Sequence, residues 1–366
     1  MLKCGIIGLP LCGKSTVLNV ITRAGAEVKP YASGKTEPNR ALVNVPDERF
    51  DRLAEIFEPK KITPASVEFV DIAGLSRDAS KGAGLGNSFL SFVSESDALL
   101  HVVRMFENPE VIHPEDTIDP ARDWQIVEME LIYRDLGVIE NRLSRLAAKK
   151  KNSNEELEEN LQLKRLQDHL MEERPLRELS LSESERRALS GYAFLTLKPE
   201  IIVLNLDESQ ASLSEQEEVH VRKLQDIASS RGIEVVQVFG RMEMDMSELS
   251  PDEQVEFMKE LEISEPGRER LIREAYKLLG LISFFTCGKD EVKAWTLHKG
   301  SNAVTAAGAI HSDLARGFIR AQVVHYGVFA ANGYSVSNCR DKGVLRLEGK
   351  EYIVLDGDII EIRFNV

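Results

Sequence analysis

The residues from Gly8 to Ser15 have the types and spacing needed to bind a chain of phosphate groups. They read Gly-Leu-Pro-Leu-Cys-Gly-Lys-Ser and match the pattern G-x-x-x-x-G-K-S/T at every fixed position. Glycine lets backbone N–H groups approach an anion closely, because it has no Cβ in the way. We therefore predict a phosphate-binding loop, with Lys14 as a catalytic cation on the β- and γ-phosphates and Ser15 as a Mg²⁺ ligand. The remaining nucleotide contacts of this loop are expected from Leu11, Cys12, Gly13 and Thr16.

A second motif, Asp71-Ile72-Ala73-Gly74, follows the strand-like segment 67–70. An acid at the end of a strand can hold Mg²⁺ directly or through water, so Asp71 is a candidate metal ligand. Gly74 can offer its N–H to the γ-phosphate, which makes it a candidate catalytic residue. Many GTPases place a water-orienting Gln after this glycine, but here Leu75 has no atom that could orient water. We therefore expect slow hydrolysis, or hydrolysis that depends on another group.

The segment Asn205-Leu206-Asp207-Glu208 ends another strand-like run, where GTPases usually carry N-K-x-D. In that motif the final Asp accepts two hydrogens from the guanine edge. Here Glu208 is a longer carboxylate and Leu206 replaces the Lys, so guanine would leave buried polar groups badly matched. Asn205, Leu206 and Glu208 are thus predicted base-binding residues, and the pattern favours ATP without excluding GTP.

The elements around these motifs alternate as in a parallel sheet flanked by helices. Short apolar runs alternate with helical patterns over residues 1–120, and the same style returns after residue 200. Residues 122–190 instead show helical spacing with a polar break at 149–154, which predicts a helical hairpin inserted into the α/β domain. We expect this α/β domain to span residues 1–280.

The pattern of apolar residues changes at about residue 282. Several strand-like runs surround a single helix-like segment, 303–315, and a strong Asp-Gly turn precedes the last strand. We therefore expect a compact α+β domain over residues 281–366, separate from the α/β domain.

Composition limits the possible partners. The 366-residue chain is 43% hydrophobic and 29% charged, as in ordinary globular proteins, and no stretch is apolar enough to span a membrane. Its four cysteines have no C-x-x-C spacing, so we expect no zinc site or disulfide and place the chain in the cytoplasm. The net charge of −14 disfavours general attraction to nucleic acid. Lys149, Lys150 and Lys151 at the hairpin tip could form a local RNA contact, the alternative being a solvated turn.

Together the motifs resemble the YchF/Obg-like ATPase family over residues 1–366. The phosphate loop, Asp71–Leu75, Ser80–Asn87 and the N-x-x-E segment carry the resemblance. Five further segments also match: His101–Arg104, Asp119–Pro120, Phe284–Thr286, Ala294–Thr296 and Asp356–Asp358. The resemblance implies a P-loop domain of the GTPase type with a helical insertion, and a C-terminal TGS module of the β-grasp type. It also implies a preference for ATP, dependence on Mg²⁺, and binding to the ribosome at the large subunit or a 70S-type particle.

The resemblance implies one more catalytic candidate. In this family a His beyond the third strand is a proposed substitute for the missing Gln, and His113 lies at the matching place, although a solvated loop His is the alternative. The TGS module has no acid–base pair or metal-ligand spacing, so we expect it to bind a partner, with RNA as one candidate, rather than catalyse.

The chain departs from the family pattern at three places. Leu11 and Cys12 replace an Asn-Val pair, Lys35 stands where the family has a Thr that can reach Mg²⁺, and Gly34 stands where some members have a redox-sensitive Cys. We hypothesise that the Lys35 ammonium replaces a monovalent cation, a solvated lysine being the simpler alternative. Cys12 lies near a helix N-terminus and a lysine, which lower a thiol pKa, so its oxidation could inhibit nucleotide binding. The alternative is that Cys12 only fills the place of Val.

The leading hypothesis is therefore an ATP-controlled switch that reports its nucleotide state to the ribosome. Two alternatives remain open. One is a GTP-hydrolysing translation GTPase, and the other is a nucleotide-binding adaptor with negligible hydrolysis, which Leu75 favours.

Overall fold

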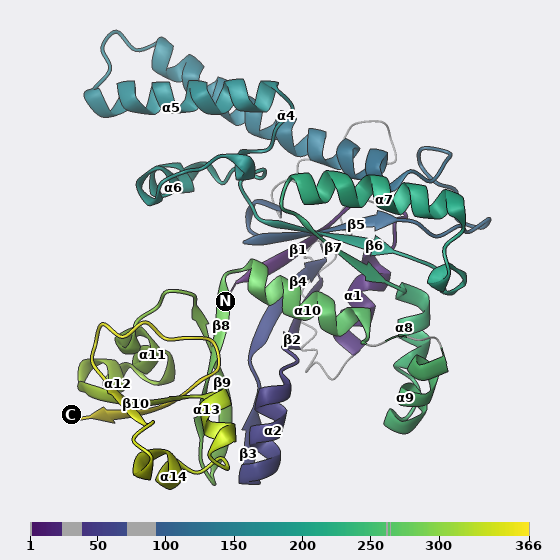
Figure 1. The fold of residues 1–366 in the computed structure, drawn as a ribbon. Helices are drawn as coiled ribbons and strands as arrows, with labels where there is room; N and C mark the ends of the chain where they lie inside the picture. The colour runs from purple at the N-terminus through teal and green to yellow at the C-terminus, as the bar shows by residue number, and fades with distance from the viewer. Residues whose placement is uncertain (1, 24–38, 72–92, 261–262, 264, 366) are drawn as a thin grey trace. The chain divides into compact units, whose positions relative to one another are not determined.

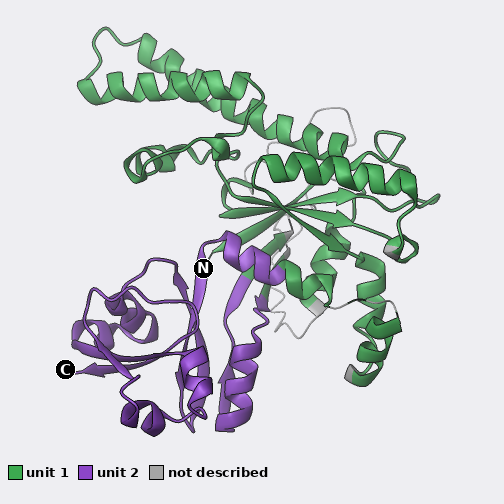
Figure 2. Ribbon diagram, viewed as in Figure 1, with its two compact units in different colours: residues 1–42, 68–271 green, residues 43–67, 272–366 purple. Residues whose placement is uncertain are grey.

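The computed structural model describes residues 2–23, 39–71, 93–260, 263 and 265–365. The chain forms two compact units, unit 1 with residues 1–42 and 68–271 and unit 2 with residues 43–67 and 272–366 (Figure 2). Unit 2 thus includes residues 43–67 and 272–280, which the sequence pattern places in the first domain. The domain boundaries at 280 and 281 stay a prediction.

The sheet of unit 1 has six strands in the order β2-β4-β1-β5-β6-β7 (Figure 1). β1 pairs in parallel with β4 and β5, and the pairs β5–β6 and β6–β7 are also parallel. Every residue of β5 and β6 is buried, as expected for central strands covered on both faces. The carboxyl ends of these parallel strands meet at one edge, which is where α/β sheets bind ligands. The strands are β1 (Lys3–Ile7), β2 (Asn39–Asn44), β4 (Ser66–Asp71), β5 (Ala98–Arg104), β6 (Glu200–Asn205) and β7 (Glu234–Val238).

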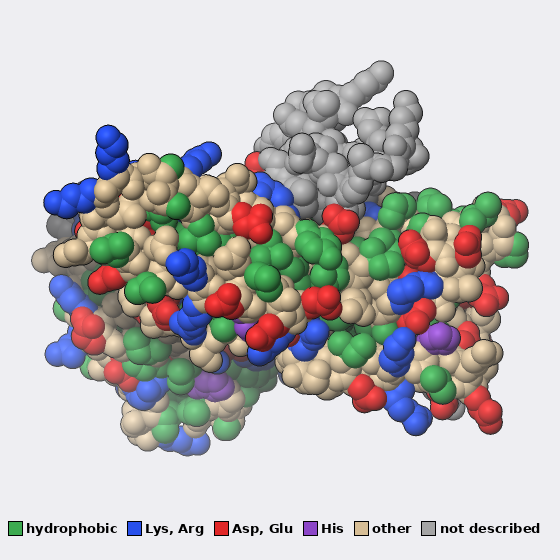
Figure 3. Space-filling view, turned by 90° about the horizontal axis from the view of Figure 1, so that it is seen from above, with side chains coloured by type: hydrophobic (Ala, Val, Ile, Leu, Met, Phe, Trp, Pro, Cys, Tyr) green, Lys and Arg blue, Asp and Glu red, His purple; other side chains and the backbone are tan. Residues whose placement is uncertain are grey.

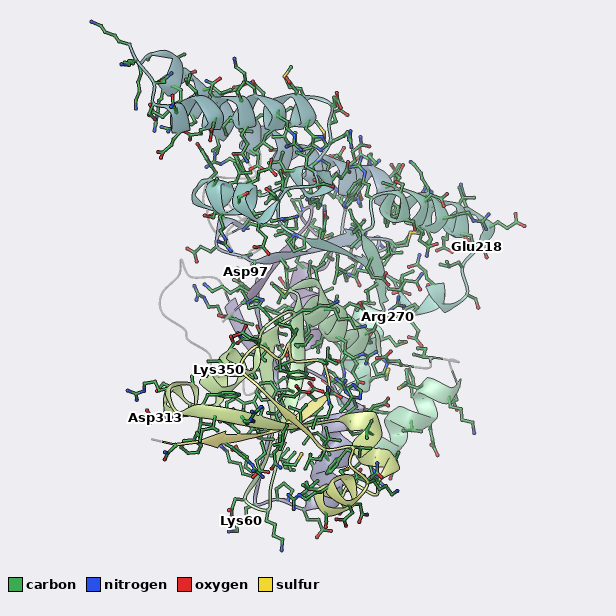
Figure 4. All side chains as sticks on the ribbon, turned by 60° about the vertical axis from the view of Figure 1, so that its left-hand side comes forward. Lys60, Asp97, Glu218, Arg270, Asp313 and Lys350 are labelled. Carbon is green, nitrogen blue, oxygen red and sulfur yellow. The ribbon has the colours of Figure 1, made fainter. Side chains whose placement is uncertain are left out.

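Asp97 fixes the alignment of the first strand in this sheet (Figure 4). Its Oδ2 accepts a hydrogen bond from the Lys3 N–H at 2.8 Å, and its own N–H donates to the Lys3 carbonyl at 2.8 Å. β1 therefore enters the sheet in the register that pairs Ile7 with His101.

Helices cover both faces of this sheet. α4 (Pro120–Ala147) and α7 (Glu215–Ser230) lie on one face, and α1 (Lys14–Arg23) and α8 (Gly240–Met246) lie on the other (Figure 1). A short 3₁₀ helix, η4 (Glu208–Ala211), follows β6 directly. The chain continues through α9 (Pro251–Glu260) and α10 (Gly267–Leu278).

α4 extends beyond the sheet and pairs with α5 (Asn154–Met171), which confirms the predicted helical hairpin (Figure 1). Asp119 caps α4 by accepting from the Arg122 N–H at 3.1 Å, and Ser153 forms a capping box at the start of α5. A separate aliphatic core, which includes Ile139 and Leu166, joins the two helices. The chain returns to β6 through η2 (Leu176–Glu178), α6 (Glu183–Leu189) and η3 (Ser190–Tyr192).

Unit 2 contains a second six-stranded sheet, in the order β11-β10-β12-β8-β9-β3. β8 and β9 form an antiparallel pair, and β12 lies parallel to β8, so the chain's last strand runs beside the first strand of the C-terminal part. β3 joins this sheet through parallel pairing with β9, and the exposed Lys60 before it pairs with Asp290 at 2.8 Å (Figure 4). The strands are β3 (Lys61–Thr63), β8 (Leu281–Cys287), β9 (Glu291–His298), β10 (Phe318–His325), β11 (Arg346–Glu348) and β12 (Asp358–Phe364).

The single helix predicted over 303–315 is two helices, α11 (Ala303–Ile310) and α12 (Ser312–Arg316). His311 interrupts them because its backbone is extended and its ring nitrogen Nδ1 accepts from the Asp313 N–H, which caps α12. Two further helices, α13 (Tyr326–Ala331) and α14 (Val336–Asp341), were not predicted, since six residues are too few to show helical periodicity. α2 (Glu48–Phe57) also belongs to unit 2 and packs on β8 and β9. No helix among the described residues is long and apolar enough to cross a membrane.

Candidate nucleotide-binding site

The loop between β1 and α1 has a backbone that only glycine permits at two positions. Gly8 and Gly13 have φ angles of 144° and 95°. A Cβ at Gly8 would lie 2.3 Å from the Val102 carbonyl oxygen, and one at Gly13 would lie 2.1 Å from Nδ2 of Asn205. The sequence prediction of a tightly wrapped loop at these glycines is therefore confirmed by the geometry.

Lys14 folds back over this loop. Its Nζ donates to the carbonyl oxygens of Gly8 at 3.0 Å and Leu9 at 2.6 Å, and the residue is only 6% exposed. The ammonium therefore lies beside the backbone that would surround the phosphates. Ser15 and Thr16 follow in the first turn of α1, and the N-terminal end of a helix favours an anion.

Asn205 connects the end of β6 to the phosphate loop. The residue is 3% exposed and its Nδ2 donates to the Cys12 carbonyl oxygen at 3.1 Å. On its other side, a Cβ added to Gly240 would lie 2.8 Å from its Oδ1. The amide thus fits between two glycines, Gly13 and Gly240, and holds the two predicted motifs together.

A pocket of about 1380 Å³ opens at this edge of the sheet. Most of the residues predicted to bind the nucleotide line this pocket. The phosphate loop contributes five of them, and the end of β6 contributes two: Leu11, Gly13, Lys14, Ser15 and Thr16, with Asn205 and Leu206. The sequence analysis missed residues from two other segments, the loop after β5 and the start of α8. They lie at the same sheet edge, which is the one signal that could have indicated them. These residues include Phe106, Glu107, Asn108, Arg241 and Met244.

Of the three residues predicted to bind the base, Asn205 and Leu206 line the pocket and Glu208 does not. Leu206 lines the pocket yet is only 2% exposed, because its side chain belongs to the core beside β5, β6 and α7. Glu208 is exposed at the first residue of η4 and does not line the pocket. Asp207 lines it instead, and its carboxylate caps η4 by accepting from the Ser209 N–H at 3.1 Å.

The ring of His113 is buried rather than solvated. Its Nδ1 accepts from the Glu115 N–H at 3.1 Å, and its Nε2 lies 2.8 Å from Oδ2 of Asp123. The residue lines a neighbouring hollow of about 910 Å³ and not the pocket that Lys14 lines. In this arrangement neither ring nitrogen is available to a water molecule beside the phosphates, so the geometry gives no support to the predicted catalytic role of His113.

The sequence predicts Ser15 and Asp71 as Mg²⁺ ligands. Ser15 is exposed at the start of α1 and lines the pocket. Asp71 is the last residue of β4, and its backbone is in register with Ile6, two residues before the phosphate loop. A hydroxyl and a carboxylate are hard oxygen donors of the kind that Mg²⁺ prefers, so both residues fit this ion. Within the described chain there is no cluster of three or more His, Cys, Asp or Glu that could hold another metal.

Three sequence predictions fall on segments outside the described residues. They concern the γ-phosphate contact of Gly74, the effect of Leu75, and the substitution of a cation by Lys35. Gly34 lies in the same part of the chain.

The hypothesis of a reactive thiol at Cys12 is wrong in its premise. Cys12 is 3% exposed, and burial raises its pKa more strongly than the nearby Lys14 lowers it. A thiol with a raised pKa is less often ionised and less readily oxidised. Cys12 therefore behaves as a small apolar residue inside the loop.

A buried polar cluster lies at the base of the hairpin, away from the pocket. Glu200 at the start of β6 accepts from Trp124 Nε1 at 2.9 Å and contacts His101 Nδ1 at 2.7 Å. Arg177 pairs with both Glu200 and Glu128. Burial raises the pKa of Glu128 to about 7, although Arg177 opposes the shift. The cluster joins the central strands of the sheet to α4 and η2.

The strand order, the glycine-bounded phosphate loop and the Asn205 contact together define a P-loop nucleotide-binding domain of the GTPase type. Residues 3–134 match a family model described as a 50S ribosome-binding GTPase, and residues 281–365 match the YchF C-terminal model, described as a protein of unknown function.

The similarity to named relatives and to one solved structure covers 99% or more of this chain. The chain is 42% identical to "Ribosome-binding ATPase YchF" of Haemophilus ducreyi over 365 residues, covering 100% of this chain and 99% of the relative. It is 41% identical to the protein of the same name from Bacillus subtilis, with complete coverage of both. The structure of the Schizosaccharomyces pombe YchF GTPase matches with a TM-score of 0.89 and 34% identity, over 99% of this chain and 97% of that one. The chain belongs to the YchF family, and the predicted fold class is confirmed.

Proposed function

We propose that this protein binds ATP with Mg²⁺, hydrolyses it slowly, and uses the nucleotide to control its binding to the ribosome in the cytoplasm. The observation that carries the preference for ATP is the position of Glu208. GTPases read guanine with a carboxylate at this fourth motif position, but here the carboxylate does not line the pocket. Guanine would then have unpaired donors, which is costly in a buried site. The names of the relatives from Haemophilus ducreyi and Bacillus subtilis support the same choice.

Hydrolysis would depend on the loop and on the oxygen ligands of the ion. The backbone N–H groups of residues 8–15 and the Lys14 ammonium stabilise negative charge on the β- and γ-phosphates. Ser15 and Asp71 would hold Mg²⁺, which supplies charge neutralisation of the phosphate oxygens when bound. Gly74 would add a backbone donor at the γ-phosphate. We expect turnover to be slow because Leu75 replaces the residue that orients water in many GTPases.

The pocket has a direct covalent connection to the hairpin. Residues from Phe106 to Val111 line the pocket, and the same loop leads through Asp119 into α4, which carries the hairpin tip at its far end. A nucleotide-dependent change in this loop would therefore be passed to α4. This route within unit 1 is the basis for proposing that the nucleotide controls binding to the ribosome.

The hairpin tip is the part of unit 1 best suited to contact ribosomal RNA. Lys149 is paired with Glu156, whereas Lys150 and Lys151 are exposed and form no ion pair within the described chain. The face seen in Figure 3 has Lys and Arg mixed with Asp and Glu, without a broad basic area. A contact with RNA would thus be local, as the net charge of −14 requires. The description of the family model matched by residues 3–134 supports the large subunit as the contact, and the TGS module is a second candidate surface.

Calorimetric titration in Mg²⁺ buffer with ATP, GTP, ADP and GDP tests the nucleotide proposal. We expect ATP to bind about tenfold or more tightly than GTP. Single-turnover phosphate release by the wild type, compared with Lys14→Ala, tests hydrolysis. Tighter binding of GTP would favour a translation GTPase, and release equal to that of the Lys14 variant would favour a non-hydrolysing adaptor.

A further inference from the structure

Arg104 is a buried cation that forms no ion pair in the part of the chain that the structure describes, and the charge of Asp123 stabilises it less than burial destabilises it. It is the last residue of β5 and is 2% exposed. Its Nη1 is buried and has no hydrogen-bond partner, and burial lowers the pKa of its guanidinium. An unpaired buried charge destabilises a fold, and an aliphatic side chain would fill the same space at lower cost. Packing alone therefore does not account for an arginine at this position.

Among the described residues, the side-chain hydrogen bond of Arg104 and its cation–π contact are both made with Phe106. Its Nε donates to the Phe106 carbonyl oxygen at 3.0 Å. Its guanidinium carbon lies 4.4 Å from the centre of the Phe106 ring, well within the range of a cation–π contact. The hydrogen bond fixes the backbone of Phe106 and the cation–π contact fixes the ring, so one side chain determines where this aromatic residue lies.

Phe106 lies at the point where the nucleotide pocket meets the phosphate loop. The ring lines the pocket, and a Cβ added to Gly13 would lie 3.7 Å from its Cε1. Asn205 and Leu206 of the base-reading segment line the same pocket. Since the guanidinium lies over one face of the ring, a ligand that stacks on the ring would have to use the opposite face. A flat aromatic group in the pocket is the ligand chemistry that such a face binds by stacking.

We propose that Arg104 is a positioning residue, which holds the Phe106 ring so that a purine base can stack on it in an arginine–phenylalanine–base arrangement. This inference rests on the proposed nucleotide-binding function and extends it to the source of affinity for the base. Stacking tolerates any purine, so Arg104 increases affinity for adenine and guanine nucleotides alike and does not select between them.

A double-mutant cycle on ATP affinity tests this inference, with competition against a fluorescent ATP analogue in Mg²⁺ buffer. Arg104→Met keeps an unbranched apolar stem and removes the charge and donors, and Phe106→Leu removes the ring. We expect each variant to bind ATP about five- to tenfold more weakly, because each removes the same stack. The double variant should bind ATP no more than about twofold more weakly than Phe106→Leu alone, because the effects of substitutions at two contacting residues do not add.

Arg231→Met is the matched control, because Arg231 makes a similar contact with Trp124 at 5.2 Å but does not line the pocket. It should leave ATP affinity unchanged. Unchanged affinity in Arg104→Met, full additivity with Phe106→Leu, or an equal loss in Arg231→Met would each overturn the inference.

If Arg104→Met shows no cooperative thermal transition, Arg104→Lys takes its place in the same cycle. It keeps the charge but loses the planar donor group, so we expect a smaller, non-additive loss, and wild-type affinity would reject the role. A wild type that binds GTP but not ATP would instead overturn the proposed function. The same cycle run with GTP would then still decide the role of Arg104.

Discussion

The amide of Asn205 donates from Nδ2 to the Cys12 carbonyl oxygen at 3.1 Å, and this buried bond joins positions 193 residues apart. One end lies in the phosphate loop and the other at the start of the base-reading segment. Both sides of the amide are enclosed by glycines, since a Cβ at Gly13 or Gly240 would lie within 2.8 Å of it. This one side chain thus links the phosphate loop to the predicted base-reading segment.

Asn205→Ala should weaken ATP binding by about tenfold and lower the free energy of unfolding by about 1–2 kcal/mol, because it leaves the buried Cys12 carbonyl without its donor. Calorimetry and denaturant unfolding measure the two effects. Asn152→Ala is a suitable control, since its Nδ2 also donates to a backbone carbonyl, that of Leu146 at 3.2 Å, but at the hairpin tip. Equal loss of ATP affinity in both variants would contradict the role given to Asn205.

Glu208→Ala should leave the ratio of ATP to GTP affinity unchanged within about twofold, because a side chain outside the pocket contributes little to base discrimination. The residue is exposed at the start of η4. The measurement is competition of both nucleotides against one fluorescent analogue. A tenfold shift in the ratio would mean that Glu208 reaches the base after all, as its place in the motif suggests.

His113→Asn should lower stability while changing the turnover number by less than about threefold, because both ring nitrogens are already engaged by protein groups. Thermal unfolding and single-turnover phosphate release separate the two effects. A folded variant with turnover reduced about a hundredfold would restore the catalytic role implied by the family resemblance.

The backbone conformation of the phosphate loop could be predicted from sequence because it depends on local residue types. Two glycines, a lysine and a hydroxyl in fixed order specify a backbone conformation and its place between a strand and a helix. The parallel sheet and the hairpin were also predictable, since long periodic segments such as α4 show which face is buried.

The remainder of the site depends on contacts that sequence spacing does not show. Phe106 and Arg241 line the pocket because the strand order brings together the segments that follow β1, β5, β6 and β7, not because they form a motif. Two further differences from the sequence predictions come from burial. Burial raises the pKa of Cys12, where the sequence predicted a lowered one, and the Leu206 side chain lies in the core. Neither degree of burial can be read from neighbours along the chain.

Glu128 should make stability depend on pH in a direction opposite to that of most carboxylates. Burial raises its pKa to about 7 in the folded protein, from an unfolded value of about 4.3, although Arg177 opposes the shift. The folded state therefore binds more protons than the unfolded state between these values. The contribution to stability is fully present below the unfolded pKa and is lost as pH rises through the folded one.

Glu128→Gln removes this titration while keeping the shape of the side chain. Relative to wild type, it should gain about 1–3 kcal/mol of unfolding free energy between about pH 5 and pH 8. Glu140→Gln, at an exposed position of the same helix, should show no such trend. A difference between Glu128→Gln and wild type that stays constant with pH, or that reverses, would reject the assignment.

Reversing the charge of Lys150 and Lys151 at the hairpin tip should weaken ribosome binding without changing ATP binding. Lys150→Glu with Lys151→Glu reverses two exposed charges that have no ion pair in the described chain and lie in the turn just after the C-terminal end of α4. We expect co-sedimentation with ribosomes to weaken by about tenfold at low salt, and the salt dependence to become shallower, because fewer counterions are released from RNA. ATP affinity without ribosomes should be unchanged.

Lys164→Glu with Lys259→Glu alters the charge equally at exposed positions away from the tip and should bind ribosomes as the wild type does. Wild-type co-sedimentation of the tip variant would show that the hairpin tip is not the RNA contact, and would direct attention to the TGS module.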